Sequence, residues 1–288
     1  MKRLYYSLLA LFLSFVFSFN APKEKSLLWR VSGNGLEKPS FLFGTIHLIP
    51  EKDYFFSDMM ESRFDSCTSL MMEVKMDMSF QDQMSVAKKV MMPAGKTYQD
   101  YMTADEYKTA LSFLQDTIGL SGTELQATMM LQPIMASSMV FNKVIKNYKI
   151  YESELNKLAK KRGMSLYGFE TLLEQTSFIT SMSLEEQFRM TDFSSEMIKG
   201  YYQMVDVYKD QDLNGMWEIM IEEDSTMMDS EFYEKLLLKR NLAWIPKIEE
   251  QSKKESTFYA VGAAHLGGDK GVIQLLIEKG YTVVPVKE

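Results

Sequence analysis

The C-terminal segment of the chain, STFYAVGAAHLGGDKGVIQLLIEKGYTVVPVKE, constrains the fold more than any other segment. Its apolar run from Thr257 to Val261 predicts a buried strand. Residues 269–279 then predict a helix that ends at Gly280, and residues 281–286 predict a second strand. Strands joined through a helix in this way usually run parallel. We therefore expect an α/β fold whose sheet is at least partly parallel.

The region that follows the N-terminal segment predicts a β-hairpin. LLWRVSG (27–33) and FLFGTIHLI (41–49) have the apolar pattern of strands, and Gly33-Asn34-Gly35 between them is a strong turn signal. Two further apolar runs of strand length follow, TSLMMEVKMD (68–77) and MSLYGFE (164–170). The predicted sheet is therefore central and mixed, and both ends of the chain contribute strands to it.

Most of the remaining chain is predicted to be helical. The expected helices lie near residues 57–66, 79–92, 103–118, 123–147, 152–162, 171–181, 184–205, 211–222 and 229–252. Pro133 is expected to kink the helix that contains it, and Pro246 to disturb the last of these helices. We expect helices to flank the sheet, with a large helical insertion or lobe at about residues 79–255.

Residues 1–20 have the plan of a secretory signal peptide. Lys2 and Arg3 precede an apolar run from about Leu8 to Phe19, which is short for a membrane span. We expect a folded domain at residues 21–288 and export to the periplasm or the outside of the cell. Because no clean A-x-A cleavage site is present, an uncleaved N-terminal anchor is the alternative. No second long apolar run exists, so no membrane span is expected in the mature chain.

The composition narrows the classes of partner. The formal net charge is -7 and no basic stripe is present, so nucleic acid is not an expected partner. Cys67 is the only cysteine, and its place at the start of a predicted strand favours a packed side chain over a nucleophile. The 24 methionines are interpreted mainly as core residues, with an adaptable binding surface as the alternative. No pattern indicates an oligomeric state.

The two histidines of the chain occur in matching turns. FLFGTIHL (41–48) and YAVGAAHL (259–266) place an apolar strand before Gly44-x-x-His47 and Gly262-x-x-His265. Glycine lets the backbone turn sharply, or approach another group closely, where a strand ends. Ligand sites in α/β sheets lie at strand ends, so the two imidazoles are expected to converge there. A purely hydrogen-bonding role is the alternative, and it explains one histidine better than a matching pair.

Two imidazoles make an incomplete metal site, because a catalytic metal typically has about three protein ligands. Glu73 is the first candidate for the third ligand, since a bare charge within an apolar strand would be costly. An edge or solvent-facing strand position is the alternative for Glu73. Glu170 and Glu152 come next, although each also has the position of a helix-start acid. If His47, His265 and a carboxylate form one site, they should lie within about 5 Å of a common point.

Arg240 and Asn241 occur together in LLLKRNLAWIPKI, on a predicted amphipathic helix. Such a pair is commonly solvated surface or a packing anchor, but apolar neighbours here suggest partial burial. A buried guanidinium requires a carboxylate partner. It can equally bind a substrate carboxylate or a developing oxyanion.

The combined motifs resemble the TraB/PrgY/GumN family, whose eukaryotic relatives include the Tiki membrane-anchored metalloproteases. The resemblance covers about residues 27–286 with collinear motifs, of which the paired Gly-x-x-His turns are the most specific. The family's strand that ends in a Glu corresponds to the segment that contains Glu73. Other segments that match the family contribute Glu152, Glu170, Thr171, Gln175, Arg240 and Asn241. The chain departs from the family pattern at Ile150, Phe169 and Gln211.

The resemblance implies a fold akin to the erythromycin-esterase and ChaN-like proteins, together with divalent-metal-dependent peptidase activity. Tiki-like relatives suggest manganese or cobalt, and the donor types also suit zinc. In this interpretation the two histidines and Glu73 bind the cation, Glu170 or Glu152 is the general base, and Arg240 holds the substrate or the oxyanion. No HExxH helix is present, which excludes an ordinary zincin.

The first predicted function is therefore an exported metal-dependent hydrolase, a metallopeptidase that acts on a peptide or protein substrate. The alternative is a non-catalytic exported or regulatory protein on the same fold, which binds peptides or another ligand through its methionine-rich helical lobe. Metal binding and peptide cleavage would separate these two functions.

Overall fold

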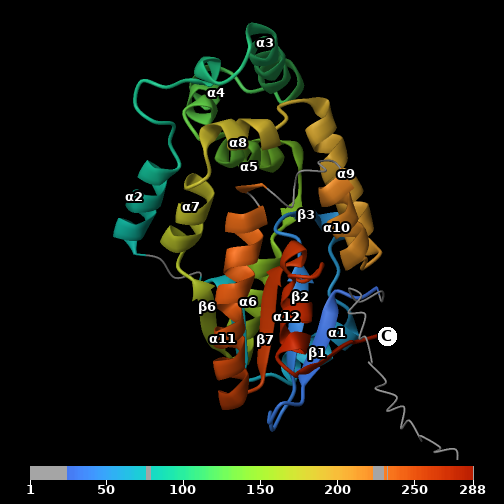
Figure 1. Cartoon of the computed structure of the whole chain (residues 1–288). Coiled ribbons are helices and arrows are strands. Elements are labelled where there is room, and N and C mark those ends of the chain that lie inside the picture. The colour runs from blue at the N-terminus through green and yellow to red at the C-terminus, as the bar shows by residue number, and fades with distance from the viewer. Residues whose placement is uncertain (1–24, 76–78, 223–229, 232, 288) are drawn as a thin grey trace, which may run out of the picture.

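The chain folds around a six-stranded mixed sheet with helices on both faces and a helical lobe at one end (Figure 1). The computed structural model describes residues 25–75, 79–222, 230–231 and 233–287. This arrangement confirms the predicted α/β fold with a central mixed sheet. The predicted signal peptide, residues 1–20, lies outside the described residues.

The strand order of the sheet is β6-β4-β7-β2-β1-β8. β1 runs antiparallel to both of its neighbours, and the other neighbouring pairs in the sheet are parallel. A separate two-stranded sheet joins β3 and β5. The strands are β1 (Leu28–Ser32), β2 (Ser40–Thr45), β3 (Ile49–Pro50), β4 (Ser69–Val74), β5 (Tyr148–Lys149), β6 (Ser165–Glu170), β7 (Thr257–Gly262) and β8 (Thr282–Pro285).

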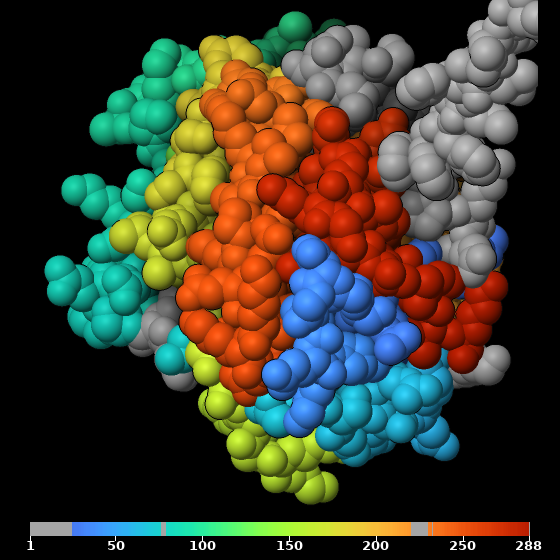
Figure 2. All heavy atoms as spheres, turned by 60° about the horizontal axis from the view of Figure 1, so that its bottom comes forward, coloured from blue at the N-terminus to red at the C-terminus, as the bar shows by residue number. Residues whose placement is uncertain are grey.

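Both chain ends contribute to the sheet, as the sequence predicts. β1 and β2 form the expected antiparallel hairpin, with Trp29 opposite Leu42. β7 and β8 are not neighbours, however, because the hairpin lies between them. All six residues of β2 are buried, which suits an interior strand covered on both faces. Figure 2, which brings the bottom of the molecule forward, shows the N-terminal hairpin in blue against the C-terminal segments in orange and red.

Successive side chains along each strand point to opposite faces of the sheet, and helices pack against both faces. On one face Phe258 packs against Phe64 of α1 (Asp58–Asp65), with ring centroids 5.0 Å apart. α6 (Tyr151–Arg162) lies on the same face and buries Tyr151, Leu155 and Ala159, which recur at helical spacing. On the other face lie α11 (Lys239–Lys254) and α12 (Val272–Glu278). Tyr259 points to that face, because its hydroxyl donates to the carbonyl of Ile248 in α11.

The helical lobe has a core of its own, which includes Tyr98, Leu114 and Phe188. Its helices are α2 (Phe80–Lys89), α3 (Ala104–Ser112), α4 (Gly122–Met129), α5 (Pro133–Val144), α7 (Leu172–Thr180), α8 (Leu184–Met190), α9 (Ser195–Lys209) and α10 (Leu213–Glu222). The middle of the chain is not one continuous insertion, because α6 and β6 return to the sheet within it. Short 3₁₀ turns lie at Glu51–Asp53, Tyr98–Asp100 and Ala263–His265, and π-helical turns at Phe113–Thr117 and Tyr233–Leu238.

Two predicted helices differ from the structure at their interiors. The helix expected at 123–147 is two helices, because Pro133 occupies the first turn of α5, where its missing N–H costs nothing, instead of kinking a longer helix. The helix expected at 184–205 is divided into α8 and α9, and Ser194 caps the second of them. Pro246 lies inside α11, which continues through it. Within the described part of the chain, no helix is long and apolar enough to cross a membrane.

Candidate functional site

Four parallel strands end at one edge of the sheet, and each carries a residue of the predicted site there. Glu73 lies at the end of β4, and Glu170 is the last residue of β6. Gly44 lies at the end of β2, and Gly262 is the last residue of β7. Residues that end these strands are register partners, such as Val74 with Glu170. This edge is where ligand sites in α/β proteins form, so the fold brings the distant motifs together.

The two motif glycines let the paired turns pack closely. A Cβ at Gly44 would lie 3.2 Å from both the Cα and the Cβ of Ala263, in the second Gly-x-x-His turn. A Cβ at Gly262 would lie 3.2 Å from Glu73 Oε1, 3.6 Å from His265 Cδ2 and 3.8 Å from His47 Nε2. Gly262 therefore sits at the point that both imidazoles and the carboxylate surround. We call His47, Glu73 and His265 the His–Glu cluster.

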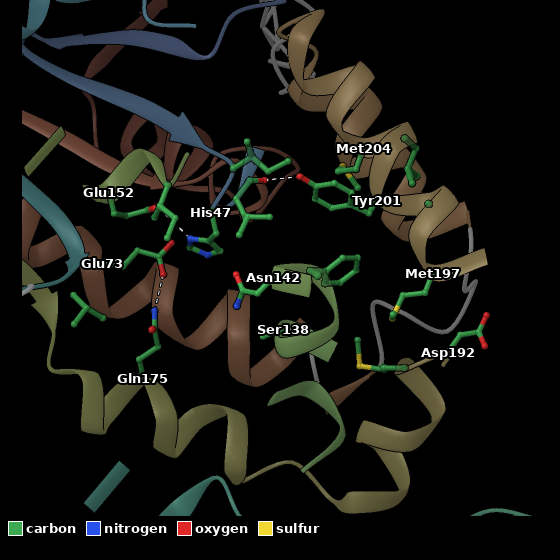
Figure 3. Close-up of a pocket in the computed structure, with 18 of the residues that line it drawn as sticks. His47, Glu73, Ser138, Asn142, Glu152, Gln175, Asp192, Met197, Tyr201 and Met204 are labelled. Carbon is green, nitrogen blue, oxygen red and sulfur yellow. Dashed lines mark hydrogen bonds and ion pairs between the residues drawn. The ribbon is translucent and has the colours of Figure 1, made fainter. Parts of the chain in front are cut away.

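His47 is held by Glu152, which begins α6. The Glu152 carboxylate oxygen Oε1 lies 3.1 Å from His47 Nδ1 and accepts a second hydrogen bond from the Thr45 hydroxyl at 2.8 Å. Figure 3 shows the imidazole beside the carboxyl groups of Glu152 and Glu73. The Glu152 charge raises the pKa of His47 to about 9, against the opposing effect of desolvation. A carboxylate on Nδ1 directs Nε2 away from Glu152, which is the arrangement that metal-binding histidines usually have.

Glu73 is buried on an interior strand, so the predicted alternative of an edge or solvent-facing position does not apply. Its Oε1 accepts the Gly262 N–H at 2.7 Å. Its Oε2 accepts from Gln175 at 2.9 Å and from Arg240 Nη2 at 2.5 Å. Burial raises the pKa of Glu73, but its interactions with the two histidine rings and Arg240, together with the hydrogen bond from the Gly262 N–H, outweigh burial and lower the pKa to about 2. Glu73 is therefore a carboxylate at neutral pH.

His265 lies in the 3₁₀ turn that follows β7 and is fixed at both ring nitrogens. Arg240 Nη1 donates to Nε2 at 3.0 Å, and because a guanidinium can only donate, Nε2 is the unprotonated nitrogen. Nδ1 then carries the proton and donates to Asn241 Oδ1 at 2.7 Å, while Asn241 Nδ2 donates to the Lys270 carbonyl. Burial lowers the pKa of His265 to about 3, so the ring is neutral. Trp244 packs on this ring, with centroids 4.4 Å apart.

Arg240 and Glu170 form a buried pair behind the His–Glu cluster. Arg240 Nε donates to both oxygens of Glu170, at 3.0 and 3.1 Å, and Trp244 Nε1 donates to Glu170 Oε1 at 2.8 Å. Arg240 is 5% exposed and Glu170 is 9% exposed, and neither lines the cavity described below. Burial lowers the pKa of Arg240, and the two carboxylates raise it by more. The geometry therefore favours positioning roles for Arg240 and Glu170 over the predicted roles of oxyanion binder and general base.

The donor types of the His–Glu cluster suit a divalent cation, because two imidazoles and one carboxylate are a common catalytic ligand set. The space that a Cβ at Gly262 would fill lies between them. Nδ1 of each imidazole has an oxygen partner, Glu152 or Asn241, so each Nε2 is the nitrogen that can bind metal. In this structure, however, His265 Nε2 accepts a hydrogen bond from Arg240. Among the described residues, no three His, Cys, Asp or Glu side chains are arranged so that they could hold a metal ion together.

A cavity of about 1110 Å³ opens from the His–Glu cluster toward the lobe (Figure 3). Its polar end contains His47, Glu73, Glu152 and Gln175, and the walls beyond are mainly apolar. The helices α5, α7, α8, α9 and α10 of the lobe contribute to it. The apolar and aromatic lining residues are Ile46, Leu48, Val74, Phe141, Ile150, Leu172, Met190, Met197, Tyr201, Met204 and Ile219.

Several residues of the site could not be assigned a role from the sequence. Tyr208 donates its hydroxyl to the Gly44 carbonyl at 3.0 Å, and Tyr201, seven residues earlier on α9, donates to the Leu48 carbonyl at 2.8 Å. These bonds tie both ends of the first Gly-x-x-His turn to the same helix. Their helical spacing on an amphipathic segment is a signal that they face the sheet, but it does not identify the partner. Asn142, which lines the cavity, carries no local signal at all.

A comparison with protein families gives one match. The TraB/PrgY/gumN family model matches residues 27–285, nearly the whole chain, and confirms the resemblance predicted from the motifs. No curated protein and no solved structure matches the chain.

Proposed function

Because this chain belongs to the TraB/PrgY/gumN family, we propose that it is a metal-dependent hydrolase that cleaves peptides at the His–Glu cluster. The observation that carries this proposal is the arrangement around Gly262, where His47 Nε2 and Glu73 Oε1 lie within 4 Å of one point beside the His265 ring. His47 and Glu73 also line a cavity large enough for a substrate. Ligand donors and a substrate space thus meet at the same strand ends.

His47, Glu73 and His265 would hold the cation, with manganese or cobalt as the first candidates and zinc as the next. When bound, such a cation polarises the scissile carbonyl and lowers the pKa of a water molecule. Arg240 Nη1 has to release His265 Nε2 for this ring to take part. Glu73 would keep its place during that change, because Gly262 N–H and Gln175 also bind it.

Glu152 is the carboxylate best placed to accept a proton from the attacking water. It lines the cavity, and both of its described hydrogen bonds go to Oε1, so Oε2 has no partner among the described residues. Glu170 is less suited, because Arg240 and Trp244 engage its oxygens away from the cavity. Glu152 would also orient the His47 ring and raise its basicity as a metal ligand.

The alternative function is that of a peptide- or ligand-binding protein without catalysis. Two observations favour it specifically: the cavity walls are mainly apolar, and His265 Nε2 is engaged by Arg240. Such a protein would use the same cavity and keep the His–Glu cluster as a structural network. It would bind peptides and leave them intact.

The two functions are separated by a cleavage assay on metal-stripped protein. A peptide library is incubated with the protein after chelator treatment, and then with manganese, cobalt or zinc restored, and the products are identified by mass spectrometry. We expect cleavage only when one of these metals is restored. If peptides bind but remain intact with all three metals, the hydrolase proposal fails and the binding function stands.

We also propose that the chain is exported, because residues 1–20 have the charge and apolar pattern of a signal peptide. Cell fractionation of the full-length chain tests this, with a version that lacks residues 2–20 as the control. We expect the full-length chain in the periplasm or medium and the shortened chain in the cytoplasm. An identical distribution of the two would contradict export.

A further inference from the structure

The cavity is polar at the His–Glu cluster, and its opposite side carries methionines beside the acidic residues Asp192 and Glu196. This arrangement bears on the substrate. Figure 3 shows Glu73, Glu152, His47 and Gln175 gathered on one side, with Tyr201, Met197 and Met204 of α9 across the cavity. Met190 of α8 joins the second group. We call Met190, Met197 and Met204 the methionine wall. A substrate bound at the His–Glu cluster would therefore extend along apolar side chains.

The methionine wall can accommodate apolar groups of different shapes. Methionine is unbranched and polarisable, and its three side-chain torsions let it fit irregular partners. The three methionines are partly accessible, and Met197 and Met204 rest against the cores of the lobe and the sheet respectively. Burying a large apolar side chain against such a surface stabilises a complex by about 1.5–3 kcal/mol relative to leaving it in water.

Asn142 of α5 is a polar group that faces the His–Glu cluster from the lobe side. Figure 3 shows its carboxamide directed toward His47 and Gln175, with Ser138 one turn earlier on the same helix. Asn142 is exposed to the cavity and has no hydrogen-bond partner among the described residues. A carboxamide offers both donors and an acceptor, so it matches the N–H and C=O of a peptide main chain.

The charges of the cavity distinguish a peptide from an anionic amphiphile such as a fatty acid. Four carboxylates line the cavity, those of Glu73, Glu152, Asp192 and Glu196, and they outnumber its two cationic side chains, Lys75 and the protonated His47. A free carboxylate or phosphate head group would meet this excess of negative charge, whereas the neutral amides of a peptide would not.

We propose that the cavity recognises a peptide by one large apolar side chain, Leu, Met or Phe, against the methionine wall, while Asn142 binds the main chain opposite His47. This proposal rests on the proposed function, because it assigns the substrate of the same site. It makes Met190, Met197 and Met204 specificity-determining residues and Asn142 a general substrate-binding residue.

The test measures binding of N-acetylated, C-amidated fluorescent peptides Gly-Gly-Xaa-Gly-Gly, with Xaa as Leu, Phe, Ala or Glu, in the Glu152→Gln background to suppress turnover. We expect Leu and Phe peptides to bind at least about tenfold more tightly than the Ala peptide, the lower end of what a few methylenes contribute in an apolar pocket. Lauric acid, as the amphiphile probe, should bind more weakly than the Leu peptide.

Variants then assign the preference to residues. Met197→Gln and Met204→Gln should remove most of the Leu-over-Ala preference, and Met197→Leu should retain it. Met130→Gln is the matched control, because Met130 is exposed and does not line the cavity. Asn142→Leu should weaken all four peptides by a similar factor and leave the preference intact, since the main chain is common to them.

Equal affinity for Leu and Ala peptides, or tighter binding of lauric acid than of any peptide, would overturn the proposal. Loss of the preference in Met130→Gln as well as in the wall variants would also overturn it. Failure of the hydrolase proposal is distinguishable. If the wild type cleaves no peptide with any metal but binds them with this preference, the recognition proposal stands and the catalytic one falls.

Discussion

His47 Nδ1 and Glu152 Oε1 lie 3.1 Å apart, although 105 residues separate them in the chain. The contact joins the first Gly-x-x-His turn, at the end of β2, to the first turn of α6. It holds the Nδ1 proton of His47 toward Glu152 and leaves Nε2 facing Glu73 and Gly262. The counterpart in the second turn is the bond from His265 Nδ1 to Asn241, a neutral acceptor in a buried setting.

These different partners predict that the two histidines titrate at opposite extremes in metal-free protein. The Glu152 carboxylate raises the pKa of His47 to about 9, and burial lowers that of His265 to about 3. NMR titration of the imidazole resonances measures both, since the chain has two histidines. In Glu152→Gln the pKa of His47 should fall toward the ordinary 6.5. Two histidines that both titrate near 6.5 in the wild type would contradict the geometry of the site.

The free energy of unfolding of metal-free protein should therefore be highest near neutral pH. The raised pKa of His47 contributes stability below pH 6.5 that is lost as the pH rises through 9. The lowered pKa of His265 contributes stability above pH 6.5 that is lost as the pH falls toward 3. Denaturant unfolding at a series of pH values checks both slopes. Glu152→Gln should flatten the alkaline slope and leave the acid slope unchanged.

Glu152→Gln should lower the rate of peptide cleavage about 10²- to 10⁴-fold, the usual contribution of a general base. The variant should remain folded, because the change is nearly isosteric, although it loses the stability that the raised pKa of His47 contributes. Glu154→Gln is the matched control, since Glu154 begins the same helix but pairs with Lys157 outside the cavity. Comparable activity of the two variants would rule out Glu152 as the base.

Arg240→Ala should destabilise the fold by about 3–5 kcal/mol, because it leaves the carboxylates of Glu73 and Glu170 buried without their cation. The adjacent Lys239→Ala removes an exposed ion pair with Glu234 and should cost less than about 1 kcal/mol. Denaturant unfolding of both variants measures the difference. Similar losses in the two would mean that the Arg240 network does not stabilise the sheet edge.

Gly262→Ala should weaken metal binding while the protein remains folded. The backbone of Gly262 has φ -53°, which alanine adopts readily, so the effect would come from the added Cβ. That atom would lie 3.2 Å from Glu73 Oε1 and occupy the space between the ligands. Circular dichroism with manganese titration tests this. Unchanged manganese affinity in a folded Gly262→Ala protein would place the metal elsewhere.

The site residues that could be predicted from the sequence are those of an uncommon type at the end of a predicted strand. The paired turns and Glu73 could be found because glycine, histidine and an acid at strand ends are unusual. The hairpin and the parallel sheet followed from local apolar patterns. The place of the hairpin between β7 and β8 did not, because strand order depends on which faces are covered by distant helices.

The roles of Glu170 and Arg240 could not be read from the sequence, because they depend on which way buried side chains point. Both carry charges suited to catalysis, yet they bind each other and Trp244 behind the cluster. Asn142 and the methionine wall lie on lobe helices whose positions are set by packing far from the histidines. Nothing in their local sequence predicts that they meet at one cavity.

The central claim, a metal site at the His–Glu cluster, is tested most directly by manganese binding to metal-stripped protein. Isothermal titration calorimetry measures this binding for the wild type, His47→Ala and His265→Ala. We predict about one ion per chain for the wild type. Removing a residue that only hydrogen-bonds to a metal ligand typically weakens metal binding by about 10- to 100-fold. Each alanine variant removes a ligand itself, so its manganese affinity should fall by more than that. Glu154→Gln, outside the cavity, should bind as the wild type does. Wild-type stoichiometry and affinity in both histidine variants would contradict a metal site at the His–Glu cluster.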